Sequence, residues 1–231
     1  MTKTSDILSS EALGFDPNVL AQRYATEREK RIRSDAEAQF VQLSHDSPFA
    51  NKYLEEDPYS ETVKRAPLND QREVIVIGGG WVGMLTAARL SQAGIRDVRI
   101  VESASDFGGT WYWNRYPGAR CDVESLEYSF SFDEDLQQAW RWSERYAGQP
   151  EILRYINHVA DRFALRPDIQ LETRVLSADF EEAPALWRVR TDQGDEVTAQ
   201  FFISAAGCLS AARTPDMVGL DDFAGLRLHT S

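Results

Sequence analysis

A glycine-rich turn between a strand-like run and a helix-like run constrains the fold of this chain more than any other feature. Residues 74–77 are apolar throughout, as in a strand that is buried on both faces of a parallel sheet. Three glycines follow in the spacing G-x-G-x-x-G, namely Gly78, Gly80 and Gly83. A helix is predicted over residues 82–93, and Gly94 ends it. Together these runs predict the first half of a βαβ unit.

The next strand-like run gives the turn a chemical meaning. Residues 98–101 read VRIV, and Glu102 follows them about 20 residues after the glycines. In a dinucleotide-binding turn the glycines allow the bend, the approach of a pyrophosphate and close helix packing, while the helix N-terminus offers amides to the phosphates. A carboxylate after the second strand accepts from ribose hydroxyls and would repel a 2′-phosphate, so the site favours FAD or NAD over NADP. The alternative is a turn that serves packing alone.

Composition and charge exclude several other classes of function. The net charge of -12 and the pI near 4.8 give a negative field, so no nucleic-acid or acidic-membrane surface is expected. Cys121 and Cys208 form no CxxC pair, and His45 and His158 are isolated, so neither a metal site nor a disulfide scaffold is predicted. Residues 1–16 lack a signal-peptide pattern and no run is long enough for a membrane helix, which predicts a cytoplasmic protein.

The composition of the chain changes near residue 70. Residues 1–70 are polar and charge-rich, and they are predicted to form a helical N-terminal extension and a connector. Asp16 and Pro17 mark the start of a helix over residues 17–43, and residues 57–70 are the connector. The extension is expected to pack on the domain or to contact a partner. Residues 71–231 are expected to form the dinucleotide-binding domain.

Later segments complete the predicted fold. A helix is expected at residues 150–165, and strands are expected at 169–176, 187–191 and 197–205. The fold class is therefore α/β, a three-layer Rossmann-like domain with a central parallel sheet and a small antiparallel element near residues 187–191. In this arrangement the later strands return beside the first one.

A loop rich in glycine and aromatic residues follows the second strand. Residues 108–122 read GGTWYWNRYPGARCD, and so much aromatic area would be unfavourable on a bare surface. The loop resembles that of the type I Baeyer–Villiger monooxygenases, which follows GGxWxxxx(F/Y)PGxxxD. The matching residues are Gly108, Gly109, Trp111, Tyr116, Pro117, Gly118 and Asp122. The resemblance continues through VESLEYSF, ERYAGQPEILRYI and ISAAGCLS, and it reaches Phe223, Gly225 and His229 in the final residues.

The resemblance implies a reaction and a set of cofactors. Enzymes of this family reduce FAD with NADPH, form a C4a-peroxyflavin with O2 and convert a ketone into an ester or lactone. It also implies that Gly78, Gly80, Gly83 and Glu102 hold the ADP half of FAD. Thr110, Trp111, Asp122 and Tyr128 would line the flavin side, and Gly109, Tyr112 and Trp113 would also bind the cofactor.

Further residues are assigned by the same resemblance. Val175 matches an adenine-contacting position, and Gly207 would let the returning strand pass close to the cofactor. Arg120, Cys121 and Asp122 match a segment that faces the nicotinamide of NADPH. Asp122 is predicted to be catalytic, because a carboxylate beside the flavin would orient an arginine and set the local electrostatics. A plain turn or capping role is the alternative for this residue.

The sequence has one glycine-rich turn of this type, and no second G-x-G-x-x-G for NADPH follows a strand. The expectation is therefore the FAD-binding portion of a Baeyer–Villiger monooxygenase, a fragment, split subunit or remnant that is inactive without the missing part. A second chain is one source of that part. The alternatives are a catalytically silent FAD-binding or interaction module, and a related flavin N- or S-monooxygenase or other FAD oxidoreductase.

Overall fold

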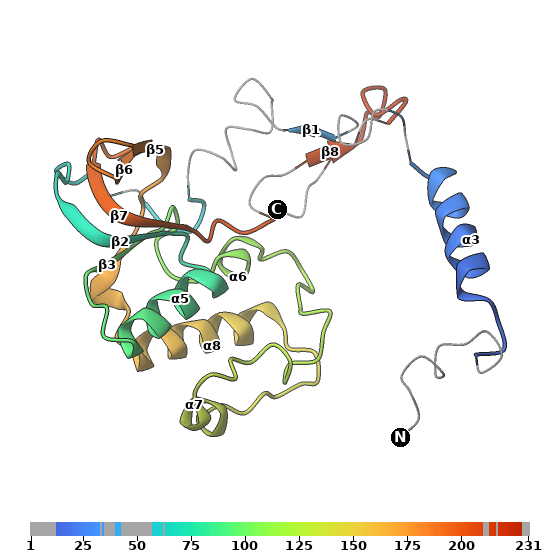
Figure 1. The fold of residues 1–231 in the computed structure, drawn as a ribbon, viewed down its shortest axis with the longest axis horizontal. Coiled ribbons are helices and arrows are strands. Elements are labelled where there is room, and N and C mark those ends of the chain that lie inside the picture. Colours follow the sequence, from blue (N-terminus) through green and yellow to red (C-terminus); the bar gives the residue numbers. More distant parts are fainter. Residues whose placement is uncertain are drawn as a thin grey trace. The chain divides into compact units, whose positions relative to one another are not determined.

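The computed structural model describes residues 13–32, 34, 40–42, 57–61, 63–209, 213–215 and 217–227 (Figure 1). Contacts divide the chain into two compact units, Met1–Val41 with Arg213–Ala224 and Gln42–Ala212 with Gly225–Ser231. The division predicted near residue 70 stays a prediction. His45 and His229, which the sequence analysis singled out, lie outside the described residues.

The larger unit is built on a six-stranded sheet with the order β4-β3-β2-β7-β6-β5. Its strands are β2 (Gln71–Ile77), β3 (Val98–Val101), β4 (Ile169–Gln170), β5 (Val175–Glu181), β6 (Leu186–Thr191) and β7 (Glu196–Ser204). The pairs β4–β3, β3–β2 and β2–β7 are parallel, while β7–β6 and β6–β5 are antiparallel. The return of β7 beside β2 and the predicted α/β fold class with its antiparallel element are confirmed.

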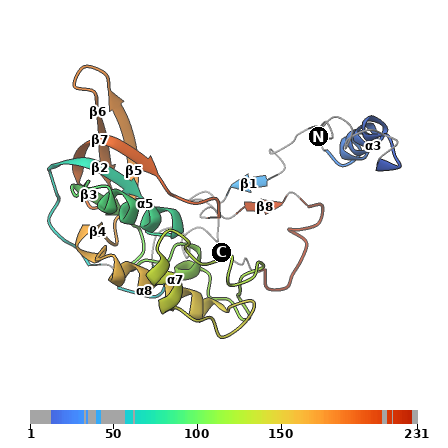
Figure 2. The same ribbon diagram turned by 60° about the horizontal axis from the view of Figure 1, so that its bottom comes forward.

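The main helices lie along the same side of the parallel strands (Figures 1 and 2). They are α5 (Trp81–Gln92) and α8 (Gln149–Arg162), and the shorter helices are α6 (Thr110–Trp113) and α7 (Glu134–Ala139). Side chains of α5, α8 and the strands form one core with fully buried Met84, Ile100 and Tyr155. Gly94 ends α5 as predicted, since the amides of Gly94 and Ile95 donate to carbonyls of its last turn. None of the described helices is both long and apolar enough to cross a membrane.

The prediction of one helix over residues 17–43 is wrong in its second half. Helix α3 (Pro17–Glu29) begins at the Asp16 cap, as predicted, but ends well before residue 43. Phe40–Gln42 forms strand β1, which pairs with β8 (Arg213–Pro215). No residue of α3 is buried, so packing does not stabilise a longer helix, and pairing with β8 supplies the later segment with backbone hydrogen bonds. Residues 35–39 and 43 are outside the described part.

The single strand predicted at residues 169–176 is two strands, β4 and β5. The chain turns between them, where Glu172 has a φ of +50°. The amides of Glu172 and Thr173 donate to the carbonyls of Ala104 and Glu102, so the chain crosses the end of β3 before β5 begins. These partners lie about 70 residues away in sequence, a separation that local periodicity does not report.

Asp195 fastens the connector to the sheet. Its carboxylate accepts from both terminal nitrogens of Arg65 at 2.6 and 2.7 Å, from the Leu68 amide at 2.7 Å, and from Thr191 and Gln170. The side chain is completely buried. Burial alone would raise the pKa of Asp195, but the hydrogen bonds from Arg65, Thr191 and Leu68 outweigh it and hold the pKa well below its usual range.

We predict that Asp195→Asn lowers the free energy of unfolding by about 3 kcal/mol, because it leaves Arg65 without its buried partner. A carboxyl with a lowered folded-state pKa stabilises the fold above its unfolded pKa of about 3.9, and this contribution is lost as the pH falls below that value. Urea unfolding at pH 7 and pH 3 measures both effects, and the variant should lose less stability on acidification. The control Asp179→Asn changes an exposed partner of Arg190 and should unfold like the parent. Equal midpoints for Asp195→Asn and the parent would contradict the prediction.

Candidate functional site

Backbone contacts that exclude side chains shape the turn between β2 and α5. Gly78 has a φ of +105°, a conformation that favours glycine. A Cβ atom on Gly83 would lie 1.8 Å from the Gly78 carbonyl oxygen, and one on Gly78 would lie 2.5 Å from the Ala205 carbonyl oxygen. Both positions therefore need glycine for α5 and the end of β7 to pack against β2.

A second pair of glycines meets this turn from the loop. A Cβ atom on Gly109 would lie 2.8 Å from Cα of Gly80, and the Gly108 amide donates to the Gly79 carbonyl at 3.1 Å. Gly80 is also the residue that caps α5, and it brings no side-chain hydrogen bond to the helix. The first amides of a helix have no partner within it, and they carry a partial positive charge. Gly79 and Gly80 of the turn thus meet Gly108 and Gly109 of the loop beside the N-terminus of α5, which is suited to binding an anion.

Glu102 lies directly behind the turn and is 5% exposed. One carboxylate oxygen accepts from the Gly79 amide at 2.5 Å, and the other accepts from the Ala104 amide at 2.8 Å and the Ser103 hydroxyl at 3.2 Å. A carboxylate has about four acceptor positions, so capacity for about one more donor remains. Glu102 therefore holds the turn in place, and its contact with a ribose hydroxyl stays a prediction.

Helix α6 carries Trp111, which is buried against Tyr128. The indole nitrogen donates to the Tyr128 hydroxyl at 2.7 Å, and the rings meet edge to face at 5.6 Å. The Trp111 carbonyl accepts from the Gln149 side chain at 2.5 Å. Burial raises the pKa of Tyr128 and outweighs the opposing effect of the hydrogen bond from Trp111, and the negative charge of Asp122 adds to the rise, so the hydroxyl stays protonated at neutral pH.

The neighbouring side chains of α6 contact a different part of the molecule. The Tyr112 hydroxyl is hydrogen-bonded to Asp57 at 2.5 Å and to Ser105 at 2.6 Å. The Trp113 ring packs edge-on against Tyr112, with its carbonyl accepting from Tyr59 at 3.1 Å. Thr110, the first residue of α6, is exposed. Of the predicted cofactor-binding residues, Tyr112 and Trp113 are thus bound by the connector.

The segment with Arg120, Cys121 and Asp122 runs beside the residues that precede α8. Arg120 donates to Glu144 and to the Tyr146 carbonyl, and the buried Cys121 thiol donates to the Ala147 carbonyl at 3.5 Å. Asp122 is exposed, and its charge acts on Tyr128. The carboxylate therefore lies in solvent beside the Trp111–Tyr128 pair, where it is available to a second charged group.

Val175 and Gly207 occupy different places from the glycine turn. Val175 opens β5 and packs with Ile75 and Val101 in the smaller core cluster. Gly207 is exposed with a φ of +77°, and a Cβ atom there would meet nothing within 4 Å. The close approach to the turn is made by Ala205, two residues earlier, which the sequence analysis did not single out. Only the register of β7 on β2, which places Ser204 beside Ile77, could have revealed it.

Asp57 of the connector and Ser105 of the loop region contact Tyr112 but were not predicted from the sequence. The contact of Asp57 joins segments 55 residues apart, whereas Ser105 lies seven residues before Tyr112, and no local motif marks either residue. Gln149 directly precedes the helix predicted at residues 150–165, and its side chain holds the α6 backbone. Across the described ranges, no three His, Cys, Asp or Glu side chains gather closely enough to hold a metal ion.

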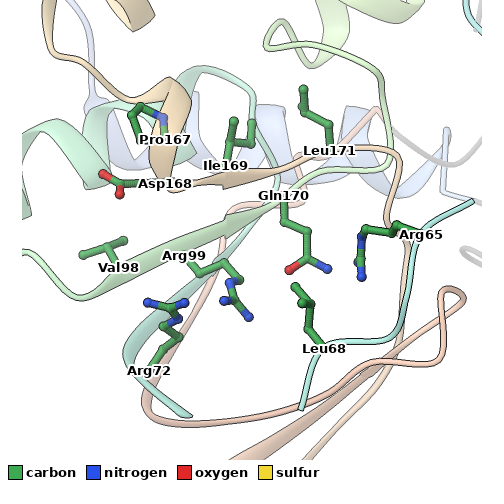
Figure 3. A pocket seen from close by; sticks show the side chains of 10 residues that line it. All are labelled: Arg65, Leu68, Arg72, Val98, Arg99, Pro167, Asp168, Ile169, Gln170 and Leu171. Atoms are coloured by element: carbon green, nitrogen blue, oxygen red, sulfur yellow. The ribbon is translucent and has the colours of Figure 1, made fainter. Parts of the chain in front are cut away.

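A cavity of about 370 Å³ lies beside β3 and β4 of the sheet (Figure 3). Val98 and Ile169, the first residues of these strands, line it together with Arg72, Arg99 and Gln170. Ligands of open α/β sheets bind beyond the carboxyl ends of the strands, where the glycine turn and Glu102 lie. Neither the motif glycines nor Glu102 line this cavity, so it is not assigned to the candidate site.

Comparison with known proteins agrees with this geometry. Residues 75–230 match the family described as pyridine nucleotide-disulphide oxidoreductase. This chain belongs to that family. A Baeyer–Villiger monooxygenase of Stachybotrys chlorohalonatus is 39% identical over 96% of this chain.

Solved structures of monooxygenases show the same likeness. A steroid monooxygenase bound to NADP is 56% identical over 65% of this chain, with a TM-score of 0.61, and the match covers 29% of that chain. A complex of OTEMO with FAD and NADP is 43% identical over 72% of this chain, with a TM-score of 0.63, and the match covers 31% of that chain. The resemblance to Baeyer–Villiger monooxygenases is confirmed. The chain spans about a third of the length of the relatives it matches, 35% for the Stachybotrys protein.

We predict that Gly83→Ala lowers the free energy of unfolding of this oxidoreductase chain by about 3 kcal/mol, because the added methyl group forces α5 away from Gly78. The control is Gly148→Ala, where φ is -77° and the nearest atom to the new methyl group lies at 3.7 Å. It should cost about 1 kcal/mol or less, as expected for alanine at a helix cap. Urea unfolding measures both variants, and equal losses would show that the close packing of α5 on the turn is not what requires glycine.

Proposed function

We propose that residues 71–231 bind FAD as part of a Baeyer–Villiger monooxygenase. Such an enzyme uses NADPH and O2 to insert one oxygen atom into a ketone, which gives an ester or lactone, and the second oxygen atom leaves as water. The observation that carries the proposal is the backbone contact between Gly80 and Gly109 beside the N-terminus of α5, where no side chain caps the helix. A further support is the family to which the chain belongs.

The residues at this site suit the pyrophosphate of FAD. Glycine at positions 80 and 109 leaves the surface of the two loops free of side chains, and the α5 amides provide donors for an anion. Glu102 follows the end of β3 and accepts a hydrogen bond from the turn. Its carboxylate has capacity for a further hydrogen bond from a ribose hydroxyl. Bound FAD would supply the redox chemistry with NADPH and O2.

The remaining roles belong to side chains of this chain. Trp111 and Tyr128 form a hydrogen-bonded wall that would exclude water from the flavin side, because both are largely buried and their polar atoms are paired with each other. Asp122, exposed beside this wall, would hold an arginine against the reacting groups through a charge-assisted hydrogen bond. Arg120 and Cys121 would place this segment toward the nicotinamide of NADPH.

The proposal divides the function between this chain and further residues. The chain has one glycine-rich turn of the dinucleotide-binding type, so FAD binding is assigned to it, and NADPH binding and the ketone pocket are assigned to residues outside the sequence given. That assignment favours a second candidate, an FAD-binding module without turnover of its own. The comparisons give no support to a second chain that supplies the nicotinamide half. A cytoplasmic location completes the proposal, since two cysteines without pair spacing suit a reducing compartment.

A turnover assay tests the proposed reaction. A full-length protein that carries residues 1–231 is expected to oxidise NADPH in the presence of a ketone and O2 and to release an ester or lactone that mass spectrometry identifies. Asp122→Asn should lower kcat by about 100-fold, as for the loss of one preorganised charge, without changing the affinity for FAD. The control Glu127→Gln alters an exposed carboxylate five residues away and should leave kcat unchanged.

Each outcome assigns the function differently. Oxidation of a thioether or an amine without attack on any ketone would favour a flavin S- or N-monooxygenase. Bound FAD with no NADPH oxidation would favour the silent module. An Asp122→Asn variant with the parent kcat would remove Asp122 from the mechanism.

A further inference from the structure

We propose that Asp57 and Tyr59, which precede the first strand of the sheet, are positioning residues that hold α6 at the flavin site. With Tyr112 and Ser105 they form a cluster that we call the connector clasp. The inference rests on the proposed binding of FAD and deepens it, because it assigns part of the cofactor site to a segment outside the dinucleotide-binding motif.

The carboxylate of Asp57 joins the connector to the loop that carries Ser105 and Tyr112. One oxygen accepts from the Tyr112 hydroxyl at 2.5 Å and from the Ser105 amide at 3.2 Å, while the other accepts from the Tyr59 amide at 2.8 Å. Tyr112 is 4% exposed, so water competes little for this bond. Burial and the hydrogen bond to Asp57 raise the pKa of Tyr112 to about 12, which keeps the donor protonated. A hydrogen bond to a carboxylate is about twice as strong as one between neutral groups.

Tyr59 holds the end of α6 in a second way. Its hydroxyl donates to the Trp113 carbonyl at 3.1 Å, and its ring packs edge-on against Tyr112 at 5.8 Å. The guanidinium of Arg115 lies 3.7 Å from the centre of the Tyr59 ring, and its Nε donates to the Tyr112 carbonyl at 2.8 Å. Two carbonyls at the end of α6 thus receive side-chain donors at the clasp.

The four residues of α6 need such contacts because a single turn of helix is unstable by itself. On one side the helix is bound through Tyr112 to the clasp, and on the other it is bound through Trp111 to Tyr128 and Gln149. Its first turn follows Gly109, whose backbone touches Gly80. A shift of α6 therefore changes the spacing of the two glycine loops, which is the spacing that the pyrophosphate would meet.

The rest of the connector is fastened elsewhere, and this provides a matched control. Glu172 accepts from the Val63 amide at 3.0 Å and from the Ser60 hydroxyl at 3.3 Å, so it binds the connector to the crossing between β4 and β5. Glu172→Gln weakens this attachment and leaves Asp57, Tyr59 and α6 intact. A connector that only stabilises the fold would be affected by either substitution. If the connector clasp positions α6, a substitution of Asp57 should affect FAD binding far more than Glu172→Gln.

The test is FAD affinity of the full chain, measured by the change in flavin fluorescence, together with the visible circular dichroism of the bound flavin and the thermal midpoint of the apoprotein. Asp57→Ala and Tyr112→Phe are each expected to weaken FAD binding by about tenfold and to change the dichroism of the bound flavin. In the double variant the losses should not add, because both remove the same hydrogen bond. Glu172→Gln should keep the parent affinity and dichroism even where its thermal midpoint falls.

Distinct results separate this inference from the proposed function. A parent chain that binds FAD while Asp57→Ala binds it with the same affinity and dichroism would overturn the clasp alone. Equal weakening by Glu172→Gln, or additive losses in the double variant, would also overturn it. A folded parent chain that does not bind FAD would overturn both proposals.

Discussion

Direct contact between backbones, with no side chain in between, is the constraint on which the candidate site depends. Gly83 lets α5 approach the end of β2, and Gly78 lets the chain after β7 approach from the other side. Gly80 and Gly109 then bring the loop onto the turn. Close packing of this kind leaves no room for relaxation, so one methyl group at Gly83 acts on the strand, the helix and the loop at once.

Carboxylates hold the glycine turn and the connector in place. Glu102 accepts from the Gly79 amide and from donors after β3, so one buried carboxylate fixes the turn relative to the second strand. Asp195 and Asp57 do the same for the connector, at the sheet and at α6 respectively. Three buried or sheltered carboxylates thus determine how loops without regular structure are placed around the end of the sheet. An acidic chain can therefore have a site suited to a phosphate, because the anion would meet amides and a helix end.

Local pattern was sufficient for the parts of the fold that are local. The strand, turn and helix of residues 71–94, the glycine spacing and the cap at Asp16 are all determined by neighbours in sequence, and each is found as predicted. The long helix over residues 17–43 was wrong because pairing with β8 decided the later part. The strand at 169–176 was wrong because the end of β3 draws Glu172 into a turn. The periodic spacing of apolar residues reports only on neighbours in sequence, so it does not predict such distant partners.

The same division applies to the candidate site. The motif glycines and Glu102 converge at the ends of β2 and β3, whereas Ala205 and Asp57 reach the site from distant segments, and neither they nor the nearby Ser105 have a motif of their own. Tyr112 was expected to face a cofactor, and its hydroxyl is bound by the connector. Side-chain direction within a four-residue turn follows from what packs around it, which the sequence does not display.

The affinity of the purified chain for FAD decides whether the two glycine loops form the cofactor site, with Gly80→Val as the decisive variant. A side chain at this position would project toward Gly109, so the account predicts that the parent binds FAD and that Gly80→Val, while still folded by far-ultraviolet circular dichroism, binds it at least 100-fold more weakly. A folded Gly80→Val protein with the affinity of the parent would contradict it, because the cofactor would then not lie against the two glycine loops.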